Sequence, residues 1–352
     1  MKKFLVKLAV LAVIIGLIFI PVSVHVDPYN VFHYSAPKYN GVESNKGFIK
    51  TKYVLKNKDK FNALVFGSSR AGFMDIEHLN SLTGLNWYDM ASSESLVSEQ
   101  THELKVFIKN GFIPKEILVM VDDISCFVSP EGHENMLYRI PYPSGGIKDM
   151  AEFYMNYFDL IMINDSLKVI KANTKTDDNY AERYRAYGNE RLDIESYFDP
   201  TEEQYQKGYF LDYYSYRGEE ALEDMKELVK VCKAYNIKLT VLTNPLYYLT
   251  YDEDVANGYL DYIEGLAKVT DFYNFSCSSD ISKNYKNYYE TSHFTPEVGR
   301  IMLDVIYNPD RFKDKTITSG GEEYNIDILN NQGFGVWVSE YNVEELMNIL
   351  KN

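Results

Sequence analysis

An α/β protein built on a central parallel sheet is predicted, because short apolar runs alternate with segments of helical periodicity. The runs are nearly continuous in apolar residues, which is typical of parallel strands covered on both faces. We therefore expect three layers, α/β/α, with helices on either side of the sheet. The candidate strands are residues 62–66, 85–88, 117–121, 237–242 and, more weakly, 269–275.

Three helices are expected between and after these strands. Leu96–Asn110 stops before Gly111, where a left-handed residue commonly closes a helix. Glu219–Tyr235 repeats apolar residues at helical spacing and includes Cys232, which we expect to be a core thiol. A further helix begins at Pro296, since proline is favourable in a first helical turn.

The amino terminus carries a membrane-anchor pattern. Residues 8–24 contain no charge, and Lys2, Lys3 and Lys7 precede them. Slightly extended, the run is long enough to cross a bilayer, and the lysines place the remainder outside the cytoplasm. A cleaved signal peptide is the alternative, but no small-x-small cleavage site follows the run. We expect a single-pass protein of the cell membrane with an extracytoplasmic body.

Four regions follow from these patterns. They are an anchor (1–24), a polar linker (25–60), the α/β body (61–315) and a C-terminal extension (316–352) that ends in an amphipathic helix. An insertion at 129–217 interrupts the body and holds thirteen of the 31 tyrosines. Tyrosine rings suit sugar faces but also pack helical caps, so the insertion is either a substrate platform or a packing element.

Composition excludes several classes of protein. Asp and Glu number 51 against 36 Lys and Arg, a net charge of −15, which argues against a nucleic-acid binder. Three scattered cysteines are too few for a disulfide scaffold or a zinc ribbon. His133-Glu134 has no second ligand at helical spacing, and the pair Asp122-Asp123 is more often solvated than metal-bound. No cofactor is expected.

The first candidate site, Gly-Ser-Ser-Arg at 67–70, follows the first strand. Gly67 allows a tight turn there. Ligands of open parallel sheets bind beyond the carboxyl ends of the strands, where a serine is exposed as a nucleophile must be. Taken alone, the motif fits a strand-to-helix turn with serine as the helix N-cap at least as well.

The second candidate site, Glu-Thr-Ser-His at 290–293, follows the last predicted strand. A serine hydroxyl needs a base, and neutral imidazole suits that task near neutral pH. The imidazole needs an acceptor on its other nitrogen, and Glu290 lies three residues before His293. A capping histidine is the alternative. Together the two motifs predict that Ser69 and His293 meet at one edge of the sheet.

In these motifs the chain resembles the SGNH (GDSL-type) hydrolases. Gly-Ser-Ser at 67–69 stands where that family has Gly-Asp-Ser, and Glu-Thr-Ser-His at 290–293 where it has Asp-x-x-His. The resemblance covers about residues 60 to 310, without the insertion. It implies that Ser69 is the nucleophile, His293 the general base and Glu290 the residue that orients the base.

The resemblance is closer still to a membrane-anchored branch, which includes the D-alanyl transfer protein of teichoic acid synthesis and alginate O-acetylation proteins. In those systems the exported domain works beside a membrane-bound O-acyltransferase. The resemblance implies transfer of acetyl or D-alanyl groups to a cell-surface polysaccharide or teichoic-acid-like polymer, or their removal from it.

The expected oxyanion hole departs from the family pattern. Where the family offers a glycine N–H, this chain has Ser92 and Ser93, which we expect to open the next helix with their N–H groups facing an anion. Where the family has an asparagine, Asp122 stands, and a carboxylate donates only when protonated. Arg70 completes the oxyanion or substrate-binding candidates. Losing one donor costs about 10²–10³ in rate. A catalytically weak partner or scaffold module for a membrane O-acyltransferase is therefore the alternative function.

Overall fold

The computed structural model describes residues 2–33, 42–124, 127, 133, 136–173, 200–208, 217–312 and 316–351, without the side chains of residues 2, 8, 9, 11–15 and 173. Two compact units make up the chain. One consists of Met1–Tyr53 with Asn135–Tyr187, and the other of Val54–Glu134 with Gly188–Asn352. The second unit contains the central sheet and both candidate motifs.

The described chain contains both helices and strands. The strands are β1 (Ala63–Phe66), β2 (Trp87–Asp89), β3 (Glu116–Val121), β4 (Lys238–Thr243), β5 (Phe272–Asn274), β6 (Tyr288–Glu290), β7 (His293–Phe294), β8 (Thr316–Ser319), β9 (Glu322–Asn325) and β10 (Val336–Val338). The α-helices are α1 (Lys2–Val26), α2 (Lys46–Lys56), α3 (Ile76–Thr83), α4 (Val97–Lys109), α5 (Ile147–Met155), α6 (Leu160–Asn173), α7 (Gly218–Ala234), α8 (Tyr248–Ala256), α9 (Tyr259–Val269), α10 (Asp280–Lys283), α11 (Pro296–Tyr307), α12 (Ile326–Asn331) and α13 (Val343–Leu350).

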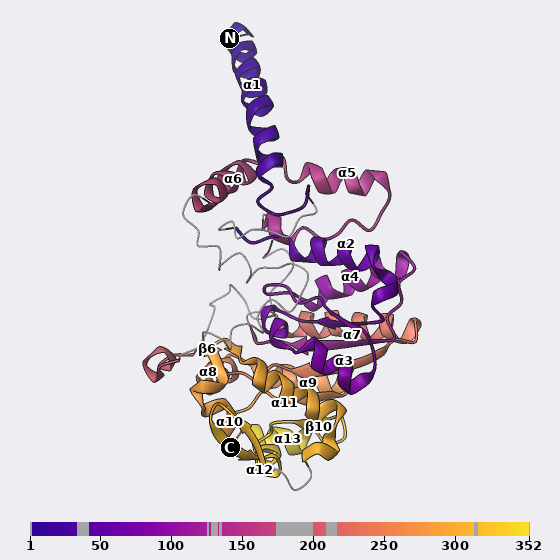
Figure 1. The fold of residues 1–352 in the computed structure, drawn as a ribbon, viewed down its shortest axis with the longest axis vertical. Helices are drawn as coiled ribbons and strands as arrows, with labels where there is room; N and C mark the ends of the chain where they lie inside the picture. Colours follow the sequence, from indigo (N-terminus) through magenta and orange to yellow (C-terminus); the bar gives the residue numbers. More distant parts are fainter. Residues whose placement is uncertain are drawn as a thin grey trace. The chain divides into compact units, whose positions relative to one another are not determined.

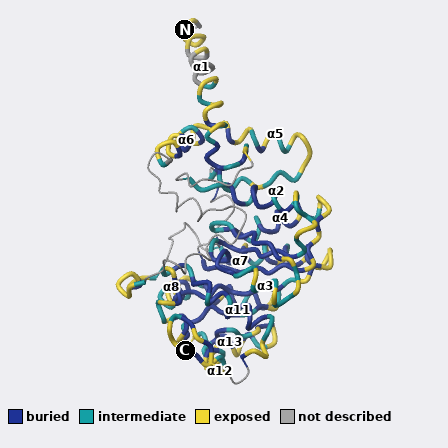
Figure 2. The backbone as a smooth tube through the Cα atoms, in the orientation of Figure 1, coloured by how far each residue is buried: buried dark blue, intermediate teal, exposed yellow. Residues whose placement is uncertain are grey.

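Figure 1 shows the course of the chain through these elements. Six strands form the central sheet, in the order β10-β5-β4-β3-β1-β2. Strands β1 to β5 run parallel, whereas β10 pairs antiparallel with β5 at one edge. Every residue of β1 and β3 is buried, in agreement with the buried centre of Figure 2. The predicted α/β fold with a mostly parallel central sheet is confirmed, and its five parallel strands lie at the predicted apolar runs.

Residues of β1 alternate between the two faces of the sheet. Ala63 and Val65 share a core with α3 and α11, for example with Met302. Leu64 and Phe66 are equally buried and point to the opposite face, since successive strand residues alternate. Helices α4, α7 and α9 pack side by side.

The predicted helices form with small shifts at their ends. Helix α4 is followed by Gly111 with φ +78°, the left-handed closing residue that the sequence predicts. Cys232 on α7 is buried as expected, and burial raises the pKa of its thiol to about 11. Cys277 is also buried, whereas Cys126 lies outside the described residues. Helix α11 begins at Pro296.

Gly67 lies directly after β1, where there is no room for a side chain. A Cβ at this position would lie 2.7 Å from the Cβ of Ala71 and 3.2 Å from the Cβ of Met120. Its φ is not in the left-handed region. Glycine is therefore needed here because the turn before Ser69 passes close to β3.

We expect Gly67→Ala to lower the free energy of unfolding by about 1–3 kcal/mol, because the added methyl group overpacks this contact. Thermal melting of the purified chain measures the effect. The control is Gly72→Ala in the same turn, because a Cβ on Gly72 would meet no atom within 4 Å. Equal melting temperatures for the two variants would contradict the packing argument.

The first unit has a small aromatic core of its own. Tyr29 and Phe48 are buried there together with Phe153 and Tyr157. The segment 25–60, expected to be a polar linker, thus contains a helix and packs against the first part of the insertion. A contact between parts of the chain so far apart leaves no local pattern in the sequence.

The described tyrosines of the insertion are buried or partly buried in packed cores. Tyr157 and Tyr205 are buried, and Tyr138, Tyr142 and Tyr154 are partly buried against the aromatic core of the first unit. These five side chains follow the packing alternative. The remaining tyrosines of the insertion, and with them most of the predicted substrate platform, lie outside the described residues.

Helix α1 covers the predicted anchor. A search of the described residues finds no helix with both the length and the apolar character needed to cross a membrane. Part of the run 8–24 lies outside the residues whose side chains are described. The anchor therefore stays a prediction.

Candidate active site

Ser69 is placed at the carboxyl edge of the sheet by the end of β1. It opens a short 3₁₀ helix, Ser69–Phe73, for which Ser68 is the N-cap, its hydroxyl accepting a hydrogen bond from the Arg70 N–H at 3.3 Å. The N-cap alternative thus describes Ser68. Ser69 is left half-buried, with its hydroxyl directed toward His293.

His293 and Glu290 lie on the two strands of the β6–β7 hairpin, directly before α11. The Oγ of Ser69 lies 2.7 Å from Nε2 of His293, although 224 positions separate them in the sequence. The Nδ1 of His293 is hydrogen-bonded to Oε1 of Glu290. The hydroxyl, imidazole and carboxylate therefore form a continuous hydrogen-bonded line, the arrangement of a nucleophile, its base and the orienting acid.

The two oxygens of Glu290 have different partners. While Oε1 binds His293, Oε2 accepts the backbone N–H of Ser292 at 2.8 Å. Burial acts to raise the pKa of this carboxyl, but the hydrogen bond and charge of His293 outweigh it and leave the pKa lowered. The carboxylate is thus ionised at neutral pH, as an orienting group for imidazole must be.

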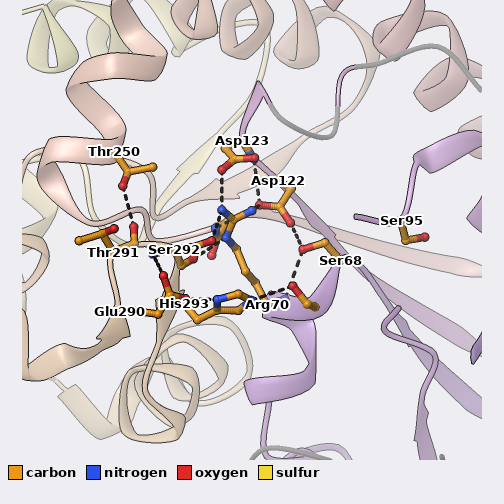
Figure 3. Close-up of polar contacts among 12 residues, drawn as sticks. Ser68, Arg70, Ser95, Asp122, Asp123, Thr250, Glu290, Thr291, Ser292 and His293 are labelled. Atoms are coloured by element: carbon orange, nitrogen blue, oxygen red, sulfur yellow. Dashed lines mark hydrogen bonds and ion pairs between the residues drawn. The ribbon is translucent and has the colours of Figure 1, made fainter. Parts of the chain in front are cut away.

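Arg70 is not on the surface of the site but beneath it. Its guanidinium is 4% exposed and donates to the carboxylates of Asp122 and Asp123. It also donates to the carbonyl oxygen of Ser292 and, at 2.6 Å, to the Ser292 hydroxyl (Figure 3). Arg70 therefore ties the turn that follows the nucleophile to the turn that carries His293. It is a positioning residue here and not the expected substrate contact.

Asp122 is fully engaged within the protein. It accepts hydrogen bonds from Ser68, Arg70 and, at 3.2 Å, from the side-chain amide of Asn244. Burial raises its pKa to about 6, despite the opposing charge of Arg70. Its bonding to Ser68 and Arg70 makes Asp122 a support of the nucleophile turn, and not the free oxyanion donor considered from the sequence.

Ser92 and Ser93, whose backbone N–H groups were expected to be oxyanion donors, do not lie where the sequence predicts them. Helix α4 begins at Val97, so Ser92 and Ser93 lie in a turn before it and do not open it. The Ser92 N–H donates to the carbonyl of Gly67 at 3.2 Å. This bond extends the β1–β2 pairing beyond the strands, so the Ser92 N–H is already used within the protein. Among the described residues, the N–H of Ser69 itself has no hydrogen-bond partner, and it lies next to the nucleophilic oxygen.

We expect Arg70→Lys to slow acylation of Ser69 by about 10–100-fold, since small misplacements of reacting groups cost this much. Lysine keeps the charge between Asp122 and Asp123 but cannot also hold Ser292. The rate at saturating fluorophosphonate probe should fall while the half-saturating probe concentration is unchanged. The control is Arg300→Lys. Arg300 lies on α11 and forms an ion pair with Asp75 at 3.4 Å. A folded Arg70→Lys protein with the wild-type rate would contradict the positioning role.

A third buried carboxyl, Asp254 on α8, borders this network. It is 2% exposed, and its Oδ2 has no hydrogen-bond partner among the described residues. Burial, and then the charge of Asp123, raise its pKa from 3.8 to about 9. The folded protein therefore keeps a proton on Asp254 at neutral pH, whereas the unfolded chain releases it.

This difference makes stability fall as pH rises, because the folded state binds more protons than the unfolded state between about pH 4 and pH 9. We expect Asp254→Asn, which presents an N–H in place of the acid O–H, to remove the decline. Its melting temperature should exceed that of the wild type by about 5 °C at pH 8 and match it near pH 4. If the melting temperatures of the variant and the wild type differed by the same amount at every pH, the assignment of the raised pKa to Asp254 would be contradicted.

Some supporting residues carry no signal in the sequence. Thr250 on α8 donates its hydroxyl to the carbonyl of Thr291 at 2.6 Å. Tyr205, in the returning part of the insertion, donates to the carbonyl of Tyr288 at 2.5 Å. Both hold the β6–β7 hairpin from outside the central sheet. Only the position of Ser292, inside the Glu-Thr-Ser-His motif, could have been suspected from the sequence.

The network holds no arrangement suited to a metal ion. Over the residues that the structure describes, no cluster of three or more His, Cys, Asp or Glu side chains could bind one. Instead, the guanidinium of Arg70 occupies the space between Asp122 and Asp123.

Comparison with protein-family models and with curated proteins identifies no relative of this chain. No protein-family model matches the chain, and no curated protein is similar to it at a significant level. The functional argument therefore rests on the chain's own residues and their geometry.

Proposed function

We propose that this protein is an exported, membrane-anchored, SGNH-like α/β/α protein that transfers an acyl group to a cell-envelope polymer, or removes one. The observation that carries the proposal is the 2.7 Å contact between Ser69 Oγ and His293 Nε2, with Glu290 on the other imidazole nitrogen. A hydroxyl so placed can pass its proton to the imidazole as it attacks a carbonyl carbon.

The reaction follows in two balanced steps. The Ser69 Oγ forms a bond to the acyl carbon, its proton moves to Nε2 of His293, and the bond to the leaving oxygen breaks as that oxygen takes the proton. An acceptor hydroxyl or water then gives its proton to Nε2 of His293 as its oxygen bonds to the acyl carbon, and the bond to Ser69 breaks as the Ser69 oxygen takes that proton back. The N–H of Ser69 is the nearest backbone donor for the oxyanion.

A second function is favoured by the state of the backbone donors at Ala91 and at Ser92, of which Ser92 was the expected one. The Ser92 N–H is bonded to Gly67 and the Ala91 N–H to Asp89, at 2.6 Å. An oxyanion hole that lacks them supports only weak turnover. In that case the chain acts as a partner module of a membrane O-acyltransferase or as a scaffold for the polymer.

Covalent labelling separates the two functions. The purified full-length chain is treated with a fluorophosphonate probe, and the labelled peptide is identified by mass spectrometry. The enzyme proposal expects label on Ser69, none in Ser69→Ala, and normal labelling in Ser81→Ala, an exposed serine of α3. Absence of label on Ser69 in the wild-type chain would leave the partner module.

The anchor and the exported body form a separate part of the proposal. They are supported by the charge-free run 8–24 and the lysines before it. Protease added to intact cells should digest the body, and a fully protected body would overturn this topology.

A further inference from the structure

The first unit exposes apolar side chains of a kind that the second unit mostly buries. In the described chain, the segment from α5 to α6 has seven large apolar residues that are exposed: Ile147, Met155, Phe158, Leu160, Ile161, Leu167 and Ile170. The described residues of the second unit include six: Ile113, Tyr235, Tyr289, Ile328, Trp337 and Tyr341. Ile147 is 91% exposed and Leu160 79%. A water-facing surface rarely gathers so many, so this α5–α6 face is suited to an apolar medium.

Helix α6 exposes large apolar side chains although polar ones are buried on it. Its buried residues also include the apolar Met162 and Val169. Asp165 and Ser166 are buried, whereas Leu160 and Leu167, seven residues apart, are exposed. The buried polar groups are satisfied: Asp165 accepts a hydrogen bond from the Tyr29 hydroxyl, and Ser166 donates to a backbone carbonyl at 2.7 Å. The exposed apolar side is therefore a property of a well-packed helix and not of a misplaced one.

Contacts within the first unit show which end of α1 lies next to helix α6. Tyr29, which binds Asp165, follows the last residue of α1, Val26, by three positions. Helix α6 is thus held at the carboxyl end of α1, and Figure 1 shows α5 and α6 running across the direction of α1 at that end. Helix α1 exposes apolar residues of its own near this end, Leu17 at 71% and Ile18 at 58%.

We propose that the α5–α6 face lies in the headgroup layer of a lipid bilayer, with both helices in the membrane plane at the point where α1 leaves it. This inference rests on the proposed anchor. Side chains such as Leu160 and Ile147 would enter about 5–10 Å into the headgroup and acyl boundary. Lys168 and Lys171 are also exposed on α6, and Lys168 pairs with Asp165 at 2.6 Å.

Depth-dependent quenching in vesicles tests the proposal with the full chain. Single cysteines are introduced at Leu160 and Ile147 in a Cys126→Ser background, since Cys232 and Cys277 are buried. Each is labelled with an NBD fluorophore and reconstituted into phosphatidylcholine–phosphatidylglycerol vesicles, with or without lipids that carry a nitroxide on the acyl chain. Leu17→Cys reports on the anchor, and Glu223→Cys, on the exposed side of α7, is the water-facing control.

The proposal expects NBD at positions 160 and 147 to lose about half of its emission to the nitroxide lipid, and NBD at position 223 to lose none. Quenching at position 17 without quenching at 160 and 147 would overturn the interfacial face and leave the anchor intact. That result includes the case in which a protein partner covers the face. No quenching at any of the three positions would overturn both the anchor and the face.

Discussion

Cells that carry Ser69→Ala are expected to lose acylation of their envelope polymer, by roughly 10³–10⁶-fold, as when other serine nucleophiles are removed. No neighbouring hydroxyl can take its place. Ser68 is buried and donates its hydrogen bond to Asp122, so its oxygen is turned away from His293. The alanine variant keeps the Gly67 turn and the Arg70 contacts, which leaves the fold and membrane insertion unchanged.

The measurement is the acyl content of the polymer in cells with the variant beside cells with the wild-type chain, at equal amounts of protein. Ser68→Ala is the matched comparison, and its effect should be milder, since it loses a support of Asp122 and not the reacting atom. Equal acylation in the Ser69→Ala and wild-type cells would rule out the enzyme function and leave the partner module as the function.

Glu290→Gln is expected to lower the rate of Ser69 acylation by about 10²–10⁴-fold, in line with the loss of the orienting acid in a serine triad. Glu290 serves two donors with two oxygens, the imidazole Nδ1–H and the Ser292 N–H. Glutamine offers one acceptor oxygen for these two donors, so either the imidazole or the turn loses its hold. The imidazole also loses the charge that stabilises it once it is protonated.

The labelling rate with the fluorophosphonate probe measures this effect on purified protein. Glu290→Asp keeps both acceptors and the charge on a shorter side chain, and it should retain more activity than Glu290→Gln. Because the pKa of Glu290 is lowered, the carboxylate is already ionised at neutral pH, so titration of Glu290 itself should add no step to the wild-type rate between pH 6 and pH 8. A glutamine variant as fast as the wild type would show that Glu290 does not orient the base.

The sequence was most informative where local and global signals agree. The continuous apolar runs of β1 and β3 predict buried parallel strands, and a parallel sheet brings the carboxyl ends of its strands to one edge. That rule places Ser69 at the edge of the sheet, whereas His293 reaches it from the separate β6–β7 hairpin, which the apolar runs do not predict. Likewise, Gly111 and Pro296 mark the limits of their helices because their effects on the backbone are local.

Prediction was least successful where a residue's role depends on a partner far along the chain. Nothing near Arg70 shows that it binds Ser292, and nothing near Thr250 shows that it holds Thr291. Helix α4 begins within one residue of the predicted Leu96, but Ser92 and Ser93 do not open it, and the Ser92 N–H instead extends the strand pairing. The segment 25–60 was expected to be a linker because its few apolar residues have no period, yet Phe48 is buried by rings of the insertion.

The edge strand β10 gives the C-terminal extension an importance that its sequence does not suggest. Val336–Val338 covers the free side of β5, whose other side is bonded to β4. A chain that ended at residue 315 would leave the N–H and C=O groups of β5 exposed as a template on which a second chain could add a strand. The C-terminal extension therefore completes this side of the sheet with a three-residue edge strand, and any shortened form intended for crystallisation or secretion should retain it.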